Sequence, residues 1–407
     1  MLSSAAFRLI LLISCAHALV HIYELSLPSV EQEIALEFHP NDPSAGKEFT
    51  GLLSNSWRLM WGFGALLAGW LVDRIGGKSM LAIYLLGCSI TCGSIAMSSS
   101  VPSLFGTMIL MGSFASIYHP AGLALISHET SAANRTQALG LHGILGSLGI
   151  ASAPFIAWAI VSTGFNWRNY YWILALPAAV FGAVFFWLAI KDKRIAQRTT
   201  TATSQTKDLP EDNEETCWPS FVVLLIIAML QGLVYAAMMS FLPRYLSIVE
   251  IRLGNASDPH YGKVLAAGVL AIGCLGQYLA GRFGRSSVLE RQLSSVMLAS
   301  VPLLLWLAFA GSWWRVLAAG AFALVHFMNQ PLYNSLVAKY TPASRRSLCY
   351  GVNFVMGFGM GSFGAAFAAF AKTEWLTYGS LAGVSTLSAA LGYVLWRWHR
   401  PSPLCRS

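Results

Sequence analysis

Charged residues are scarce in this chain. Asp, Glu, Lys and Arg together make up 11% of its 407 residues, whereas hydrophobic residues make up 56%. Soluble domains contain roughly 25% charged residues, so the scarcity excludes an ordinary soluble fold. Long apolar runs recur along the chain instead, and they indicate a protein that crosses a membrane many times.

Two kinds of chemistry are also missing. The sequence contains no Gly-x4-Gly-Lys-Ser/Thr segment, which excludes an ATP-binding loop of that kind as an energy source. No nucleophile, base and orienting group occur at a recognisable spacing, so the sequence predicts neither an enzyme nor a cofactor. The seven cysteines lie in apolar runs or on the predicted inner side, which excludes an external disulfide framework.

The apolar runs predict twelve transmembrane helices. Their expected ranges are 5–27, 49–72, 79–98, 103–127, 136–162, 169–190, 218–246, 261–281, 289–310, 314–338, 347–371 and 375–398. With both termini in the cytoplasm, most of the 26 Lys and Arg residues fall on the cytoplasmic side, as the positive-inside rule requires. The net charge of +8 therefore reports topology in a lipid bilayer, and it predicts no nucleic-acid partner.

The chain divides into two halves. We expect a six-helix bundle over residues 1–190, a cytoplasmic linker over 191–217, a second six-helix bundle over 218–398 and a cytoplasmic tail over 399–407. The segment Ile117-Tyr118-His119-Pro120 matches Met328-Asn329-Gln330-Pro331, and the same offset places His142 onto Asn353. The sequence thus predicts an all-α membrane protein with two parallel repeats.

A charged, glycine-rich hairpin separates the second and third predicted helices. Its sequence is Gly69-Trp70-Leu71-Val72-Asp73-Arg74-Ile75-Gly76-Gly77-Lys78, and a degenerate copy follows at Gly281-Arg282-Phe283-Gly284. The hairpin resembles the signature loop of the major facilitator superfamily. The resemblance implies the major facilitator fold, a monomeric secondary transporter, and gating roles for Asp73, Arg74, Arg135 and Arg282. Asp73 ends its helix, where its charge can meet the N-terminus of a neighbouring helix.

Two further segments resemble exporters within that superfamily. His17, Tyr23 and Leu27-Pro28 in the first helix, with Tyr118-His119-Pro120 in the fourth, are similar to bacterial fosmidomycin-resistance-type exporters. His21 stands where that group has Asp, and Ala121 stands where it has Glu. Gly140, Gly149, Ala153 and Pro154 keep the spacing of an antiporter motif in the fifth helix, with Ala153 in place of Gly. These resemblances imply proton-coupled export across a bacterial cytoplasmic (inner) membrane.

Ionisable residues inside the predicted helices need a reason to be there, because a charge at the bilayer centre costs roughly 2.5–3.5 kcal/mol on insertion scales. His17, His21 and Glu24 form one stripe on the first helix. Arg58 lies about 22 Å above the inner surface, the same depth as Glu24. The sequence therefore predicts a Glu24–Arg58 contact, which is either a structural ion pair or part of a site where Arg58 binds an anionic solute.

The two halves differ in their polar residues. His119 and His142 are expected at similar depths on consecutive helices, facing each other. The second half offers His326, Asn329, Gln330, Tyr333 and Asn353. The amide side chains hydrogen-bond but do not titrate near neutral pH, so the protonatable groups are concentrated in the first bundle.

These features lead to one main hypothesis and two alternatives. The main hypothesis is alternating-access transport of a small organic solute, with the proton as coupling ion and proton binding at His17, His21, Glu24 or His119. A transition-metal or metal-chelate transporter is the first alternative, because His and Glu are metal ligands; on the first helix only His17 and His21 are close enough to share an ion. The second alternative is a membrane sensor or scaffold.

Overall fold

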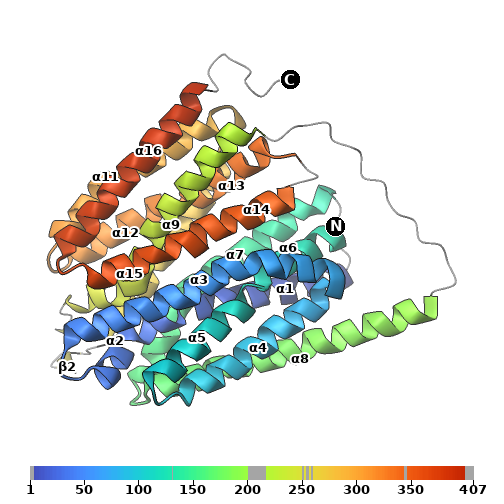
Figure 1. Ribbon diagram of the computed structural model, residues 1–407, viewed down its shortest axis with the longest axis horizontal. Helices are drawn as coiled ribbons and strands as arrows, with labels where there is room; N and C mark the ends of the chain where they lie inside the picture. Colours follow the sequence, from blue (N-terminus) through green and yellow to red (C-terminus); the bar gives the residue numbers. More distant parts are fainter. Residues whose placement is uncertain are drawn as a thin grey trace.

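The computed structural model describes residues 4–130, 132–199, 217–249, 252–253, 256–257, 260–342 and 346–398. Within these ranges the chain is helical apart from short loops and one small hairpin, in which β1 (Arg252–Leu253) pairs antiparallel with β2 (Ala256–Ser257). The helices form two bundles that lie side by side (Figure 1).

The first bundle contains six passes. In chain order these are α1 (Ser4–Glu24) with α2 (Ser26–Phe38), α3 (Pro43–Ile75), α4 (Gly77–Ala96), α5 (Val101–Ala115) with α6 (Tyr118–Glu129), α7 (Ala132–Val161) and α8 (Trp167–Thr199). Three passes are clearly longer than the sequence predicted, and one of them is α3, which begins at Pro43 instead of residue 49 and ends at Ile75 instead of residue 72. The first pass continues to Phe38 instead of ending at residue 27, and α8 continues through the start of the expected linker to Thr199. The rest of that linker, residues 200–216, and the tail 399–407 lie outside the described residues.

The second bundle also contains six passes. These are α9 (Trp218–Ser247), α10 (Tyr261–Phe283), α11 (Leu289–Phe309) after the 3-10 turn η1 (Ser286–Val288), α12 (Trp314–Phe327) with α13 (Asn329–Tyr340), a composite helix, and η5 (Trp375–Gly379) with α16 (Ser380–Trp398). The composite helix runs through α14 (Arg346–Phe354), the π-helical η3 (Val355–Gly359), the 3-10 turn η4 (Met360–Ser362) and α15 (Phe363–Phe370). The twelve predicted passes are confirmed.

The helices suit a lipid environment. In the described part of the chain, ten passes are long and apolar enough to cross a membrane by length and composition. The other two passes are α3, and α12 with α13. Large apolar side chains such as Ile90, Leu176 and Phe309 are exposed on the surface of the bundles, where lipid tails would cover them.

Proline breaks three passes at positions that matter for the polar residues. Pro28 has no N–H for the carbonyl of Glu24, and the first pass breaks between α1 and α2 at Leu25. Pro120 and Pro331 act in the same way near the starts of α6 and α13. The breaks at Pro120 and Pro331 occupy equivalent places in the two halves, in the segments that the sequence repeat matches.

The two ends of the bundles differ in how they are joined. We name the end that holds Ser4, Thr199 and Trp218 the linker end, and the opposite end, which holds the loops after Phe38 and Ser247, the far end (Figure 1). Along the middle, α3 packs against the composite helix and α7 packs against α10. Gly62 of α3 faces the backbone of Gly359 so closely that a side chain at position 62 would clash, as is usual where small residues bring membrane helices together.

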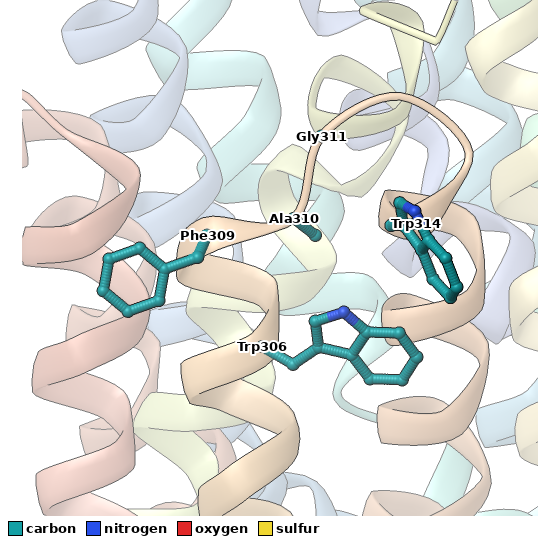
Figure 2. Close-up of a pocket in the computed structure, with 5 residues that line it drawn as sticks. All are labelled: Trp306, Phe309, Ala310, Gly311 and Trp314. Carbon is teal, nitrogen blue, oxygen red and sulfur yellow. The ribbon is translucent and has the colours of Figure 1, made fainter.

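An aromatic hollow of about 370 Å³ lies at the far end, in the loop between α11 and α12. Figure 2 shows the rings of Trp306, Phe309 and Trp314 around Ala310 and Gly311. Aromatic rings gather where a membrane meets water. The hollow is therefore part of an interfacial belt, and it contains none of the polar residues predicted to form the site.

Candidate functional site

Glu24 is the centre of the buried polar cluster. The break before Pro28 places it at the last residue of α1, and its side chain is completely buried. Its Oε1 accepts hydrogen bonds from Arg58 Nη1 and from the hydroxyl of Tyr235, each at 2.8 Å. Its Oε2 lies 2.7 Å from His21 Nδ1. The predicted contact between Glu24 and Arg58 is present, and Tyr235 extends it to the second bundle.

A chain of hydrogen bonds continues from Glu24 down the first helix. His21 Nε2 lies 3.1 Å from His17 Nε2, and His17 Nδ1 lies 2.8 Å from the backbone oxygen of His142. We call Glu24, His21 and His17 the relay. All three side chains are buried, with 2%, 8% and 7% of their residue surfaces exposed.

The hydrogen bonds of the relay fix how many protons it must carry. The carbonyl of His142 can only accept a hydrogen bond, so His17 Nδ1 must carry a proton. The hydrogen bond between the two Nε2 atoms requires a second proton, on either His17 or His21. The hydrogen bond between His21 and Glu24 requires a third proton. Two neutral imidazoles and a carboxylate supply only two of these three protons. The fully hydrogen-bonded relay therefore contains one excess proton.

His142 and His119 both lie against His17. The ring of His142 stacks on His17 with centroids 3.8 Å apart, and its Nε2 lies 2.9 Å from the hydroxyl of Tyr118. The ring of His119 meets His17 edge-on at 5.4 Å. The two histidines were predicted to face each other; His17 contacts both of them. One nitrogen each from His17, His21 and His119 lie within 4.8 Å of one another.

Arg58 uses only part of its hydrogen-bonding capacity. Its residue is 1% exposed, and Nη1 donates to Glu24. Among the described residues, no group accepts a hydrogen bond from its Nε or Nη2. The indole N–H of Trp61, one turn further along α3, is equally buried and equally without an acceptor in the described part of the chain.

The predicted residues of the second bundle do not form one cluster. Asn329 Nδ2 donates to Gln231 Oε1 at 3.3 Å, and Gln330 accepts from Gln277 at 2.5 Å. The hydroxyl of Tyr333 donates to the carbonyl of Leu224. The ring of His326 stacks on the ring of Tyr235, with centroids 6.2 Å apart. Within the described ranges, Asn353 Oδ1 has no hydrogen-bond partner. Only His326 touches a residue that binds Glu24.

Ion pairs join the bundles at the far end. Arg244 of α9 donates from Nε and Nη2 to the two carboxylate oxygens of Glu31, each at 2.7 Å. Lys263 of α10 donates to Glu33 at 2.6 Å. Among the described residues, ion pairs at the linker end, such as Lys78–Asp192, stay within one bundle. Ion pairs between described residues therefore join the two bundles only at the far end.

The predicted gating residues lie at the linker end. Asp73 and Arg74 are exposed in the last turn of α3, and Arg74 stacks at 3.8 Å on Trp70. Asp73 forms no ion pair within the described ranges. Arg282 is exposed beside Phe283, and the side chain of Arg135 lies outside the described residues.

Tyr235 is the main residue that the sequence reasoning missed. A signal for it was present, because the offset that pairs His119 with Gln330 also pairs Glu24 with Tyr235. Glu31 and Arg244 were missed because the first helix was expected to end before Glu31. The unexpected continuation of that helix as α2 carries the carboxylate to its partner.

Comparisons with known proteins agree with this architecture. The family model described as "Major Facilitator Superfamily" matches residues 12–366. A bacterial homolog of the human lysosomal transporter Spinster, in an inward-facing and unoccupied conformation, superposes with a TM-score of 0.73 at 14% identity, covering 97% of this chain and 98% of the other. A D-xylose-proton symporter gives 0.71 at 14% identity, covering 94% and 96%. An auto-inhibited POT family peptide transporter gives 0.73 at 12% identity, covering 98% and 99%.

One curated relative matches over a short stretch. A triacylglyceride transporter from Mycolicibacterium smegmatis is 30% identical over 118 residues, which is 29% of this chain. The match spans only 21% of that relative's length.

Proposed function

Because the chain belongs to the major facilitator superfamily, a family of transporters that are not enzymes, we propose that it is a proton-coupled secondary transporter of a small organic solute. The two bundles rock about the central cluster and expose it to one side of the membrane at a time. The observation that carries the coupling is the relay, which needs one excess proton to complete its hydrogen bonds. The D-xylose-proton symporter has the same fold, which supports a proton as coupling ion.

We place the linker end in the cytoplasm of a bacterial inner membrane. The positive-inside rule supports this orientation, since Arg74, Lys78 and Arg282 all lie at that end. The far-end ion pairs then close the external side in this conformation. Export by proton antiport rests on the similarity to exporters in the first, fourth and fifth helices.

Glu24→Gln tests the coupling with little change of shape. A glutamine Nε2 can donate to His21 Nδ1, so all three relay contacts can form with two neutral imidazoles and no excess proton. The substitution removes the negative charge of Glu24 together with the positive charge of the excess proton, so the net charge of the cluster, including Arg58, does not change. We therefore expect a folded protein that still exchanges solute but no longer uses a proton gradient.

Proteoliposomes loaded with a low-molecular-weight cell extract provide the assay. Mass spectrometry identifies which solutes leave, with and without an imposed pH gradient. The wild type should move its solute faster with the gradient, and Glu24→Gln should move it at one rate in both conditions. Glu37→Gln, which alters a carboxylate paired with Arg168 within the first bundle, is the control and should stay coupled. Wild-type flux that ignores the gradient would refute the proposal.

A transition-metal transporter is the second candidate, favoured by the convergence of His17, His21 and His119. The fixed positive charge of Arg58, joined to His21 through Glu24, opposes a dication there. Calorimetric titration of the wild type and His21→Ala with Zn²⁺ separates the two functions. Tight binding that the substitution abolishes would favour the metal.

A further inference from the structure

The guanidinium of Arg58 has a free edge, and that edge has a specific shape. A guanidinium presents five N–H donors in a planar fork. Glu24 takes Nη1, which leaves the side formed by Nε and Nη2 without an acceptor among the described residues. Two parallel N–H groups on one edge match the two oxygens of a carboxylate. Glu24 cannot fill this edge, because Oε1 already accepts two bonds and Oε2 lies against His21.

A buried charged donor without an acceptor is costly, and native proteins normally satisfy it. Arg58 is 1% exposed, so the bulk solvent does not satisfy the edge. Two other buried N–H groups nearby share this state: the indole of Trp61, one turn along α3, and Nε2 of Gln231, one turn from Tyr235 on α9. Tyr235 itself lies with its ring 5.4 Å from the Arg58 guanidinium. Among the described residues, buried donors without an acceptor thus come from both bundles.

Aromatic side chains flank these donors. Trp61 is completely buried, and its ring lies 5.2 Å from Phe354 and 4.8 Å from Phe358, both on the composite helix of the second bundle. Rings from opposite bundles therefore meet at the level of the cluster. These rings touch each other in this conformation, so an apolar body packs against them only when the bundles part at this level, while its charged group reaches the donors.

The geometry points to an amphiphilic monocarboxylate as the solute: a single carboxylate that binds side-on to Nε and Nη2 of Arg58, attached to an apolar or aromatic body that packs against the aromatic surface formed by Trp61, Phe354 and Phe358. This inference rests on the proposed transport function and names its substrate class. Binding joins the two bundles, because the carboxylate meets Arg58 of the first bundle while the body packs on rings of the second.

Binding to purified protein in nanodiscs tests the inference without requiring transport. The probes are benzoate, 3-phenylpropanoate and hexanoate, each compared by calorimetry with its own amide. A carboxylate on the guanidinium edge makes charge-assisted bonds that the amide cannot, so we expect at least one acid to bind about tenfold or more tightly than its amide. Octyl phosphate is titrated as a further probe. If the protein binds octyl phosphate more tightly than every carboxylate, the inference that the solute is a carboxylate is overturned.

Two arginine variants locate the effect. Arg58→Lys keeps the charge but loses the fork, so the preference for acid over amide should fall about tenfold or more. Arg168→Lys, at a half-buried arginine of the far end, should retain the preference for acid over amide. Thermal unfolding confirms that each variant is folded; if Arg58→Lys is not, the acid-to-amide ratio of the wild type alone decides.

The outcomes separate the two proposals. Equal binding of acids and amides by the folded wild type, or no binding of any acid at millimolar concentration, overturns the carboxylate inference and leaves proton-coupled transport standing. Acid-selective binding together with flux that ignores a pH gradient supports the inference and refutes the coupling.

Discussion

Glu24 accepts hydrogen bonds from residues of three helices in two bundles, and this explains why a carboxylate is tolerated at such depth. Its partners Arg58 and Tyr235 donate to one oxygen, and His21 contacts the other. Removing one member of a buried ion pair leaves the other charge uncompensated, which typically costs about 3–5 kcal/mol. The roles of the two charged residues can therefore be separated by changing them singly and together.

Arg58→Met should lower the stability of the protein by roughly 3–5 kcal/mol, because the carboxylate loses its guanidinium partner. Adding Glu24→Gln should restore the midpoint of thermal unfolding, since no unpaired carboxylate then remains. Transport in proteoliposomes should stay absent, because the carboxylate-binding edge is gone. Recovered transport in the double variant would mean that Arg58 serves only to hold the helices.

The sequence predicted most of this cluster from helical periodicity and depth. The stripe of His17, His21 and Glu24 and the matching depth of Arg58 were sufficient, because helix geometry fixes both. The order of contacts around His17 could not be predicted, since the rotation of α7 about its axis is set by packing. The free edge of Arg58 could not be predicted either, because it depends on which hydrogen-bond acceptors reach the guanidinium in the folded protein.

Among the elements, α2 connects the two bundles at the far end. It carries Glu31, which is 2% exposed, to the bidentate contact with Arg244. The sequence did not predict α2 as helix, because Leu27-Pro28 reads as a helix end. The chain instead resumes its helix after the break and places three polar residues, Glu31, Gln32 and Glu33, against α9 and α10.

Arg244→Gln should loosen the far end. Loss of a charge-assisted bidentate bond, about 1.5–3 kcal/mol, should shift the population towards the conformation that is open at the far end by roughly tenfold or more. Spin labels on α2 and α9 at the far end should report the longer distance in a larger fraction of molecules.

Arg315→Gln is the matched control for this prediction. Arg315 donates two bonds, of 2.6 and 2.8 Å, to Glu374, also at the far end, but both residues belong to the second bundle. The control should change the stability of that bundle and leave the distance between α2 and α9 unchanged. An equal shift in both variants would show that the Glu31–Arg244 pair does not hold the bundles together.

For the whole molecule, the twelve passes and the twofold repeat followed from hydropathy and from matching segments, because lipid requires helices that satisfy their own backbone. The sequence could not show which end of the bundles is closed. That depends on pairings such as Lys263–Glu33 between residues distant in the chain, and another conformation would replace them.

Asp73→Asn should slow transport without lowering the stability of this conformation. Asp73 is exposed and forms no ion pair within the described ranges, so its charge has a role only when the linker ends of the bundles meet and a helix N-terminus approaches it. Transport rates at equal membrane abundance, together with unfolding midpoints, check both parts. Normal flux would remove Asp73 from the gate.

The contact between Tyr235 and Glu24 has a consequence for the mechanics of the molecule. The two residues occupy equivalent positions in the two halves, and a residue that touches its own counterpart must lie close to the pseudo-twofold axis. That axis runs along the membrane normal, and displacement in a rigid rotation grows with distance from the pivot, so atoms that lie near both the axis and the middle of the membrane move least when the bundles rock. If the bundles rock as proposed, we expect Arg244 and Glu31 at the far end to separate by more than the hydroxyl of Tyr235 and Glu24.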